Sequence, residues 1–461
     1  MGFIVGFCRR VLRIILDIIV VLLLITFLPG IPPNVSFTAY ELDDALPFDG
    51  PLAKNEILNN AERILDGKII GPESVASRRS DEIFVSLHNG KILRLWGKNF
   101  DHFQTVTTIG PGCDGPWQER ICGRPLGMRF APDGRLIIAD AYLGLFALNV
   151  DTGEKERLVD TAVPIDGVLA KLPDDLDIDE EGNIYWSDAS TVSDLSDGFI
   201  EMSSDPSGRL LKFDPKTKTN TVLLKNVHFA NGVQLSPGND FVLLCETFRS
   251  RVLRYWLKGP NAGKTDVFVD RLPGRPDNIR ARRNGGYYVS LVAVDNEENM
   301  DAFKFLTRMP LLRKLILRLF ALPKLLFDAI SWVYPNQITD NISYKIFHLQ
   351  PIVDLIASNA CVIVELDANG KIVGSLQGDN GKVRLVSETD HVGNYLFFGS
   401  PYNNYLGYLH IGGEEEVPHE EQPAVIEVMG EGVTVKTLDE KEVKQELKQE
   451  TKTGQSPKEE L

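Results

Sequence analysis

Short apolar runs separated by turn residues dominate the chain from residue 80 to residue 411. Each run has four to seven residues, is rich in β-branched and aromatic side chains, and is bounded by Gly, Asn, Asp or Pro. They include IFVSL, KILRLW, RLIIAD, LFALNV, NIYWSD, RLLKFD, FVLLCE, RVLRYWL, YYVSL, VIVELD and YLFFGS. This pattern is typical of β-strands joined by tight turns, and it predicts an all-β body.

The turns repeat at a nearly constant spacing. They fall near Asp81, Gly134, Gly182, Asn239, Gly285 and Gly393, about 50 residues apart except for one interval of about 108 residues. A period of roughly 40–50 residues with several strands per unit indicates a β-propeller, in which each blade is a four-stranded sheet. Six turns therefore predict a six-bladed β-propeller that occupies residues 40–411 as one domain.

The long interval contains an insertion, 296–337, with a different pattern. Its sequence PLLRKLILRLFALPKLLFDAISWVY places apolar residues at helical spacing among four basic ones. This predicts a basic amphipathic helix that is broken at Pro323. Two compatible interpretations stay open. The segment 311–333 contacts a membrane surface, or the helices form a cap over one face of the propeller.

The N-terminal stretch 11–28 is apolar and follows Arg9 and Arg10, although Asp17 interrupts it. The basic flank predicts a signal anchor, with residues 1–10 in the cytoplasm and 11–28 in the membrane. The body then faces the lumen or the outside, as in a single-pass type II protein of the endoplasmic reticulum or plasma membrane. A cleaved signal peptide is the alternative, and the lack of a small-x-small cleavage site disfavours it.

Charge is concentrated at the C-terminal end. From Gly412 onward there are 14 acidic and 6 basic residues, so −8 of the net charge of −15 lies in residues 412–461. This composition predicts an acidic, disordered tail. Its last four residues, Lys-Glu-Glu-Leu, resemble a retrieval signal of the endoplasmic reticulum. The body is only mildly acidic, which argues against a nucleic-acid partner.

Cysteines and sequons agree with a lumenal body. The five cysteines show no zinc-ligand spacing. A disulfide between Cys113 and Cys122 is expected in that compartment, with two reduced thiols as the alternative. Cys245 and Cys361 lie in strand-like runs, where buried thiols are the default. The sequons at Asn34 and Asn341 predict glycosylation.

Several motifs together resemble those of the strictosidine-synthase-like family. They are CGRPLGMRF, SGRLLKFDPKTK, FANGVQLSP (229–237), RYWLKGP (254–260) and LPGRPDNIR (272–280), and they occur in the expected order. The resemblance covers residues 40–411. It implies a six-bladed propeller related to paraoxonases and to gluconolactonase-type lactonases.

The resemblance also implies a calcium ion in the central channel, held by oxygen atoms from several blades. The matching positions are Glu73, Asp174, Asn231 and Asp277, with Asn278 beside them, and Asp174 stands where the relatives carry Asn. Carboxylate and amide oxygens are the hard ligands that calcium prefers. Taken one at a time, each of these residues also fits an ordinary turn.

The family's condensation of an amine with an aldehyde relies on a glutamate near the last inner strand. Here that region reads SETDHVGNYLFFGS, with Asp390-His391-Val392-Gly393 in place of the family's pattern. We therefore expect no condensation activity. Asp390 and His391 are the candidates for activating water by accepting a proton, and a structural role is the alternative for His391.

These features predict a membrane-anchored hydrolase of the arylesterase or lactonase type. Calcium would be its cofactor, and a small apolar ester or lactone would be its substrate. The alternative is a propeller without catalytic activity that binds a lipid, a small ligand or a protein partner, because propellers serve both roles. The sequence leaves the oligomeric state open.

Overall fold

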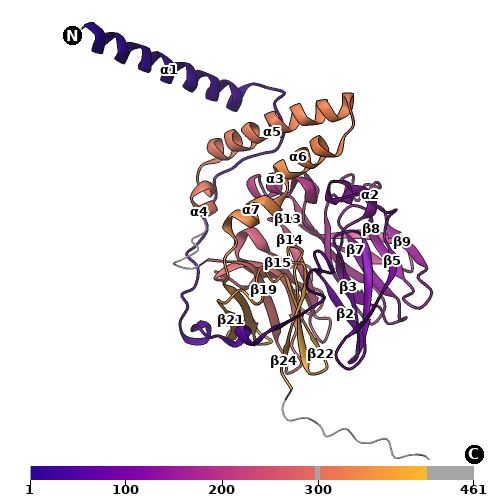
Figure 1. Ribbon diagram of the computed structural model, residues 1–461. Coiled ribbons are helices and arrows are strands. Elements are labelled where there is room, and N and C mark those ends of the chain that lie inside the picture. The colour runs from indigo at the N-terminus through magenta and orange to yellow at the C-terminus, as the bar shows by residue number, and fades with distance from the viewer. Residues whose placement is uncertain (1, 296–301, 413–461) are drawn as a thin grey trace, which may run out of the picture. The chain divides into compact units, whose positions relative to one another are not determined.

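The computed structural model describes residues 2–295 and 302–412. These residues form six four-stranded antiparallel sheets (Figure 1). The innermost strands are β2 (Val75–Arg79), β6 (Pro125–Phe130), β10 (Pro173–Ile178), β14 (Ala230–Leu235), β18 (Gly274–Ala281) and β22 (Glu388–Val392). Each of them contacts the next, and β22 contacts β2, so the sheets close into a ring. This is the six-bladed propeller predicted from the turn spacing.

Each blade continues outward from its inner strand through tight turns. Gly134 and Asn239, at two of the turns identified from the sequence, have φ angles of 85° and 53°. Gly and Asn tolerate this left-handed conformation best, which explains their recurrence there. The outer strands of five blades are β3 (Glu82–Ser86), β4 (Lys91–Trp96), β5 (His102–Thr108); β7 (Leu136–Asp140), β8 (Gly144–Leu148), β9 (Lys155–Val159); β11 (Ile184–Asp188), β12 (Gly208–Asp214), β13 (Thr219–Val227); β15 (Phe241–Glu246), β16 (Arg251–Trp256), β17 (Thr265–Val269); and β19 (Tyr287–Val294), β20 (Cys361–Leu366), β21 (Ile372–Gly378).

The sixth blade joins the two ends of the propeller. It contains β22, β23 (Tyr395–Gly399) and β24 (Leu406–His410), with β1 (Glu62–Ile64) as its outer strand. β1 pairs antiparallel with β24, so the N-terminal segment completes a sheet that is otherwise formed by the last residues of the propeller. The sequence did not predict this closure, because three residues carry too little pattern to be recognised as a strand.

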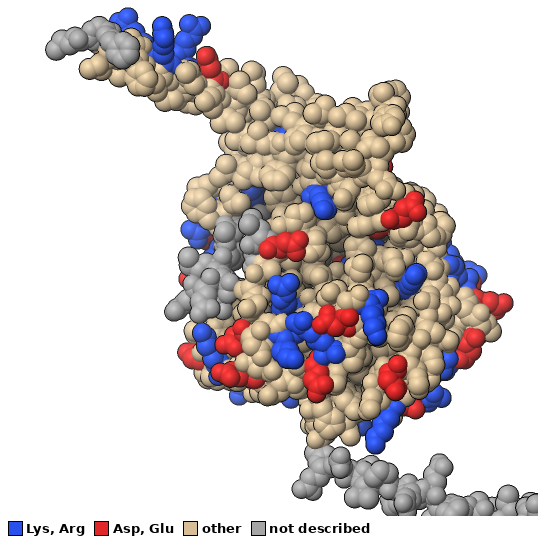
Figure 2. Space-filling model, in the orientation of Figure 1, with Lys and Arg blue, Asp and Glu red and all other residues tan. Residues whose placement is uncertain are grey.

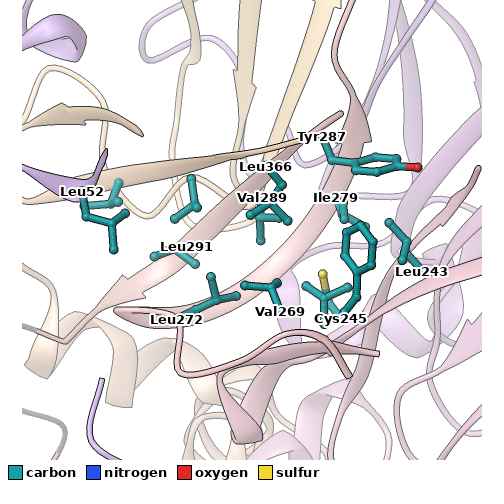
Figure 3. Close-up of a cluster of buried hydrophobic side chains, with 14 residues drawn as sticks. Leu52, Leu243, Cys245, Val269, Leu272, Ile279, Tyr287, Val289, Leu291 and Leu366 are labelled. Carbon is teal, nitrogen blue, oxygen red and sulfur yellow. The ribbon is translucent and has the colours of Figure 1, made fainter. Parts of the chain in front are cut away.

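Apolar side chains pack between neighbouring blades. Figure 3 shows one such cluster, which contains Leu243 of β15, Ile279 of β18, and Val289 of β19 with Leu366 of β20. Burial of such aliphatic groups is the main stabilising contribution of the fold. Cys245 lies in the same cluster with a free thiol, and Cys361 is likewise buried and unpaired, as expected for both.

The insertion is longer and more continuous than predicted. It forms α4 (Ala302–Thr307), α5 (Pro310–Val333), α6 (Gln337–Phe347) and α7 (Leu349–Ile356), so it extends well beyond residue 337. The expected break at Pro323 is wrong, since α5 runs through it. Pro323 is exposed, so the carbonyl that loses its N–H partner there can be satisfied without a buried replacement.

The insertion caps one end of the propeller (Figure 1). Its helices α5, α6 and α7 contact short helical segments that lie in loops at that end. The short helices of the propeller are η3 (Pro116–Gln118), α2 (Glu119–Cys122), η4 (Leu195–Asp197), α3 (Gly198–Ser203) and η5 (Thr247–Arg249), whereas η1 (Gly50–Leu52) and η2 (Ile57–Asn60) pack on β21. Of these, α3, η3 and η4 contact the insertion directly.

The N-terminal stretch forms one helix, α1 (Gly2–Phe27). Arg318 of α5 donates hydrogen bonds to the carbonyl oxygens of Ile25, Thr26 and Leu28, each at 2.9 Å, and so binds the end of α1 to the insertion. Among the described helices, none is both long enough and apolar enough to cross a membrane. The stretch 11–28 is thus helical, as predicted, but the structure does not support its prediction as a membrane span.

The structure tests the predicted disulfide but not the predicted glycosylation or the predicted acidic tail. Cys113 and Cys122 form a disulfide, as predicted. Asn34 is exposed and Asn341 is half-buried in α6, and glycosylation of both stays a prediction. The predicted acidic tail and its retrieval-like end fall on 413–461, outside the described residues.

Candidate active site

A cavity of about 640 Å³ lies at the capped end of the propeller, where the inner strands begin. Its walls are apolar and come from loops and from the insertion, whereas its floor is polar. The walls include Phe199, Phe229, Phe248, Phe320, Leu349 and Ile352. The polar lining consists of Glu73, His88, Arg124, Asp174, Asn231, Asp277 and His348, among others. The structure thus brings together four of the five predicted metal ligands beneath an apolar chamber.

The ligand candidates occupy the same place in successive blades. The pairing of the first two strands shifts register across Asp174 in β10, across Asn231 in β14 and across Asp277 in β18. Such a bulge bends the strand and redirects a side chain, here at the start of each inner strand. Glu73 stands just before β2. Next to it, a Cβ on Gly399 would lie 1.7 Å from the carbonyl oxygen of Glu73, so only glycine permits this approach.

Four buried oxygen atoms in this region accept no hydrogen bond from any described residue. They are Oε2 of Glu73 and the Oδ1 atoms of Asn231, Asp277 and Asn278. Asn231 lies beside Asp277 and lowers the pKa of its carboxyl. All four atoms are acceptors, and an acceptor buried without a partner is costly. The floor therefore needs a donor or a cation.

Positive charge near the floor does not offset the burial of its carboxylates. Burial raises the pKa of Glu73 to about 7, and Glu388 adds to this effect while Arg124 opposes it. Burial, and then the negative charge of Glu73, raises the pKa of Asp174 and of Asp277 well above the usual range. A bound cation would relieve both the desolvation and the mutual repulsion.

The donor chemistry fits calcium, which binds six to eight oxygen ligands. In residues 2–295 and 302–412, no three His, Cys, Asp or Glu side chains gather closely enough to hold a metal by themselves. A site here needs the amide oxygens of Asn231 and Asn278 beside the carboxylates. The assignment of Glu73, Asp174, Asn231, Asp277 and Asn278 as calcium ligands stays a prediction.

Deeper in the channel, the charges balance one another. Arg280 lies 2.6 Å from Asp175 and 2.6 Å from Glu388, and Arg129 lies 3.7 Å from the other oxygen of Glu388. All four side chains are buried or nearly so. Among the described residues, the channel carboxylates Asp175 and Glu388 thus have arginine partners, whereas Glu73, Asp174 and Asp277 form no such ion pair.

The two predicted catalytic residues lie elsewhere. Asp390 and His391 are on β22, past Glu388, and neither lines the cavity. Nε2 of His391 lies 3.2 Å from the carbonyl oxygen of Gly393, in the turn that follows β22. Burial raises the pKa of Asp390 to about 7. Their catalytic roles stay predictions, and the structure does not bring them to the floor residues.

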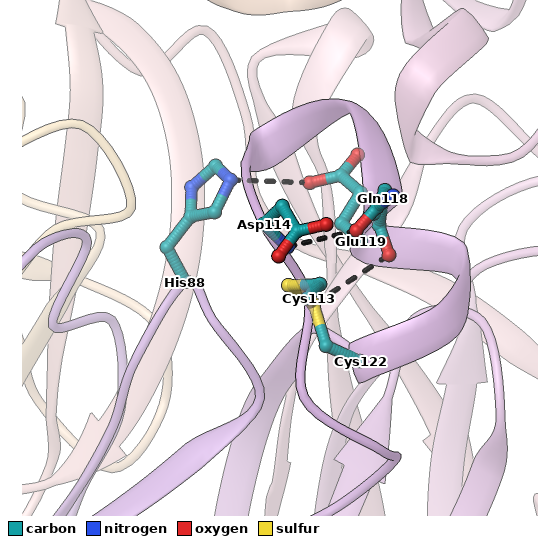
Figure 4. Close-up of a disulfide and its surroundings, with 6 residues drawn as sticks. All are labelled: His88, Cys113, Asp114, Gln118, Glu119 and Cys122. Carbon is teal, nitrogen blue, oxygen red and sulfur yellow. Dashed lines mark hydrogen bonds and ion pairs between the residues drawn. A yellow bond between two sulfur atoms is a disulfide. The ribbon is translucent and has the colours of Figure 1, made fainter. Parts of the chain in front are cut away.

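A second cluster in the cavity wall was missed by sequence reasoning. The carboxylate of Glu119, on α2 beside the Cys113–Cys122 disulfide, lies 3.4 Å from Nε2 of His88 (Figure 4). It also lies 3.6 Å from Nε2 of His348. His88 follows β3 and His348 joins α6 to α7. No spacing relates these three residues in the sequence, because only the cap brings them together.

Two family profiles match the chain. The profile described as strictosidine synthase matches residues 174–260, and the profile described as strictosidine synthase-like, N-terminal, matches residues 50–95. The first covers β10 to β16 with Asp174 and Asn231, and the second covers the region of Glu73. Both fall within the part of the chain on which the sequence motifs indicated a resemblance.

Curated relatives extend the similarity to most of the chain. The adipocyte plasma membrane-associated protein Hemomucin of Drosophila melanogaster is 36% identical over 430 residues, which are 91% of this chain and 72% of the relative. The adipocyte plasma membrane-associated protein of Salmo salar is 35% identical over 354 residues, 76% of this chain and 77% of the relative. That of Gallus gallus is 35% identical over 78% of this chain and 80% of the relative.

Solved structures align more distantly. A gluconolactonase from Xanthomonas campestris has a TM-score of 0.48 at 12% identity, over 83% of this chain and 99% of that one. Regucalcin, a calcium-binding protein from Agrobacterium tumefaciens, has a TM-score of 0.46 at 12% identity, over 76% of this chain and 94% of that one.

Proposed function

The chain belongs to the adipocyte plasma membrane-associated protein family, and from this premise we propose that it hydrolyses small apolar esters or lactones with calcium as cofactor. The observation that carries the proposal is the set of four unpartnered buried oxygens beside the floor of an apolar cavity. An oxygen-only set that lacks positive charge is suited to calcium, and an apolar chamber of this size is suited to a small organic substrate.

The floor residues would hold the cofactor. Glu73, Asp174 and Asp277 provide negative charge, and Asn231 and Asn278 provide neutral oxygens. When bound, calcium polarises the carbonyl of an ester and stabilises the negative charge that develops on its oxygen. Asn231 lies beside Asp277, so an amide and a carboxylate oxygen would face the same ion.

The walls would select the substrate and exclude water. Phe199, Phe229 and Phe248 come from loops of the propeller, and Leu349 and Ile352 come from α7. Removal of water strengthens the electrostatic interactions at the floor. A substrate with an aromatic or short aliphatic group beside its carbonyl would fill the chamber and place the carbonyl at its polar end.

We further propose that the protein associates with a membrane, as the names of its relatives say of those proteins. Figure 2 shows few charged side chains over α1 beyond its first turns and over α5, in contrast with the propeller. Leu311, Leu326 and Trp332 of α5 are exposed apolar residues. Contact through α1 and 311–333 would orient the cavity toward lipid, with the body on the lumenal or external side.

The test measures calcium and turnover on the full chain in detergent. The purified protein is assayed for bound calcium and for hydrolysis of phenyl acetate, with and without a chelator. We expect one calcium per chain and hydrolysis that the chelator abolishes. Asp277→Asn should lose both, whereas Asp379→Asn, on the propeller surface, should lose neither. Bound calcium without turnover would favour a non-catalytic binding propeller, and turnover that survives both the chelator and Asp277→Asn would refute the proposal.

A further inference from the structure

The buried carboxylate of Glu119 lies between two imidazoles that both line the cavity. Its Oε2 is 3.4 Å from Nε2 of His88, and its Oε1 is 3.6 Å from Nε2 of His348. The hydroxyl of Tyr142 also donates to Oε1. Glu119 is only 1% exposed, so neighbouring side chains rather than water surround its negative charge. One carboxylate with two imidazoles in a cavity wall is an arrangement that can move protons.

Glu119 is held in place and ionised. It begins α2, which ends at Cys122 of the disulfide, so the loop that carries it is closed covalently (Figure 4). Burial pushes the pKa of Glu119 up, but the neighbouring imidazole of His348, and then His88 and Arg124, lower that pKa to about 2. A fixed negative charge opposite Nε2 of an imidazole favours the tautomer that carries its proton on Nε2.

The two histidines differ in their other ring nitrogen. Nδ1 of His348 accepts the backbone N–H of Gln350 at 3.0 Å and caps α7, so this nitrogen is already occupied. Nδ1 of His88 accepts no hydrogen bond from the described residues, and its side chain is 15% exposed in the cavity. Burial, and then the charge of Arg124, lowers the pKa of His88 to about 3, so its ring is neutral at pH 7.

We propose that His88 is the proton acceptor of the hydrolysis and that Glu119 is its positioning residue. This inference rests on the proposed function. As water attacks the carbonyl carbon, a C–O bond forms and the proton of the water passes to Nδ1 of His88. When the bond to the leaving oxygen breaks, that oxygen takes the proton from Nδ1. No further reactant is needed, and the ring returns to its neutral form.

The geometry favours His88 over the residues singled out from the sequence. Asp390 and His391 are absent from the cavity lining, whereas His88 lines the same cavity as Glu73 and Asp277. The contact of 3.4 Å to Glu119 is longer than a hydrogen bond, and catalytic contacts of this kind tighten when substrate binds. Glu119 would then stabilise the imidazolium that forms during the reaction.

The test is chemical rescue in the calcium-loaded full chain. His88→Ala should lower kcat for phenyl acetate by 10²–10⁴-fold, as removal of a general base typically does, with bound calcium unchanged. Added imidazole should restore part of the loss, because the vacated space opens into the cavity. His348→Ala should not be rescued, since its loss is one of positioning. His102→Gln, at an exposed site on β5, is the control and should keep full activity.

A second measurement does not depend on turnover. In the protein labelled with ¹⁵N-histidine, the His88 signals should report a proton on Nε2 and none on Nδ1, and Glu119→Gln should change that tautomer balance. Full activity of His88→Ala, equal rescue of His348→Ala, or a proton on Nδ1 of His88 would overturn the inference while leaving the calcium hydrolase intact. Wild-type protein without any turnover would refute the proposed function and this inference with it.

Discussion

Arg280 binds Asp175 in the middle of the channel through two parallel hydrogen bonds. Nη1 of Arg280 donates to Oδ2 of Asp175 at 2.6 Å, and Nη2 donates to Oδ1 at 2.9 Å. Nη2 also donates to Glu388 on the neighbouring inner strand, so one guanidinium connects three blades. A bidentate pair of this kind fixes geometry as well as charge. The channel below the cavity is therefore held by an arginine, whereas Glu73, Asp174 and Asp277 at the floor form no ion pair with any described residue.

Arg280→Met should destabilise the protein by about 3–5 kcal/mol, because it leaves the buried carboxylates of Asp175 and Glu388 without their main partner. Urea denaturation with calcium present measures the loss. Arg135→Met, which removes an exposed pair with Asp133, is the control and should cost less than about 1 kcal/mol. Equal effects of the two substitutions would contradict a structural role for the channel network.

The calcium-free protein should become less stable as the pH rises. The pKa of Glu73 is raised from 4.5 to about 7, so between these values the folded state binds a proton that the unfolded state has released. Stability from such a group is complete below pH 4.5 and is lost as the pH rises through about 7. The slope is about 1.4 kcal/mol per pH unit for each such group. Asp174 and Asp277 shift in the same direction.

Calcium should abolish this part of the pH dependence, because the cation replaces the protons on the floor carboxylates. Thermal unfolding at pH 5 and pH 7.5, with chelator and with calcium, measures the difference. Calcium should stabilise the protein strongly at pH 7.5 and weakly at pH 5. Equal stabilisation at the two pH values would show that the ion does not bind at Glu73, Asp174 and Asp277.

The fold could be predicted from the sequence because its signals are local and repeated. A turn such as the one at Gly134 needs a left-handed residue, and the same need recurs in the next blades. The ligand candidates could be predicted from the sequence for the same reason, since Asp174, Asn231 and Asp277 occupy equivalent bulged positions. Repetition of the blade, rather than any single motif, carries this information.

The cavity wall could not be predicted, because non-repeated segments build it. His348 belongs to a helical cap whose length the pattern underestimated, and Glu119 belongs to a four-residue helix inside a disulfide loop. The hypothesis for His391 relied on its place in the last inner strand, where the family carries a glutamate, but His391 lies past the cavity on that strand. Which residue faces the substrate depends on how the cap packs on the propeller, and local sequence patterns do not predict this packing.

Removal of the disulfide should impair catalysis more than calcium binding. Cys113→Ser with Cys122→Ser should lower stability by about 2–3 kcal/mol, the value expected for opening a loop of this length. Glu119 would lose its fixed position, so kcat should fall while bound calcium stays constant. Cys8→Ser, at an exposed free thiol, is the control and should change neither property. Loss of calcium in the double variant would show that the loop supports the floor rather than Glu119.

The exposed apolar face of α5 should lie within a membrane interface. Trp332 is 85% exposed near the end of α5, and a tryptophan gains stability at such an interface, where its ring is apolar and its N–H is solvated. In the full chain bound to vesicles, brominated lipids should quench Trp332 more than the other four tryptophans.

Trp332→Phe should therefore remove most of the quenching by brominated lipids, whereas Trp256→Phe, on β16 of the propeller, should leave it unchanged. The end of α1 is bound to α5 through Arg318, so α1 and α5 should approach the lipid together. Arg318→Met, which frees α1 from the insertion, should reduce the quenching of Trp332 even if α1 stays in the vesicle. Quenching that Trp256→Phe removes, or that Arg318→Met leaves at its full value, would contradict a joint membrane contact of the two helices.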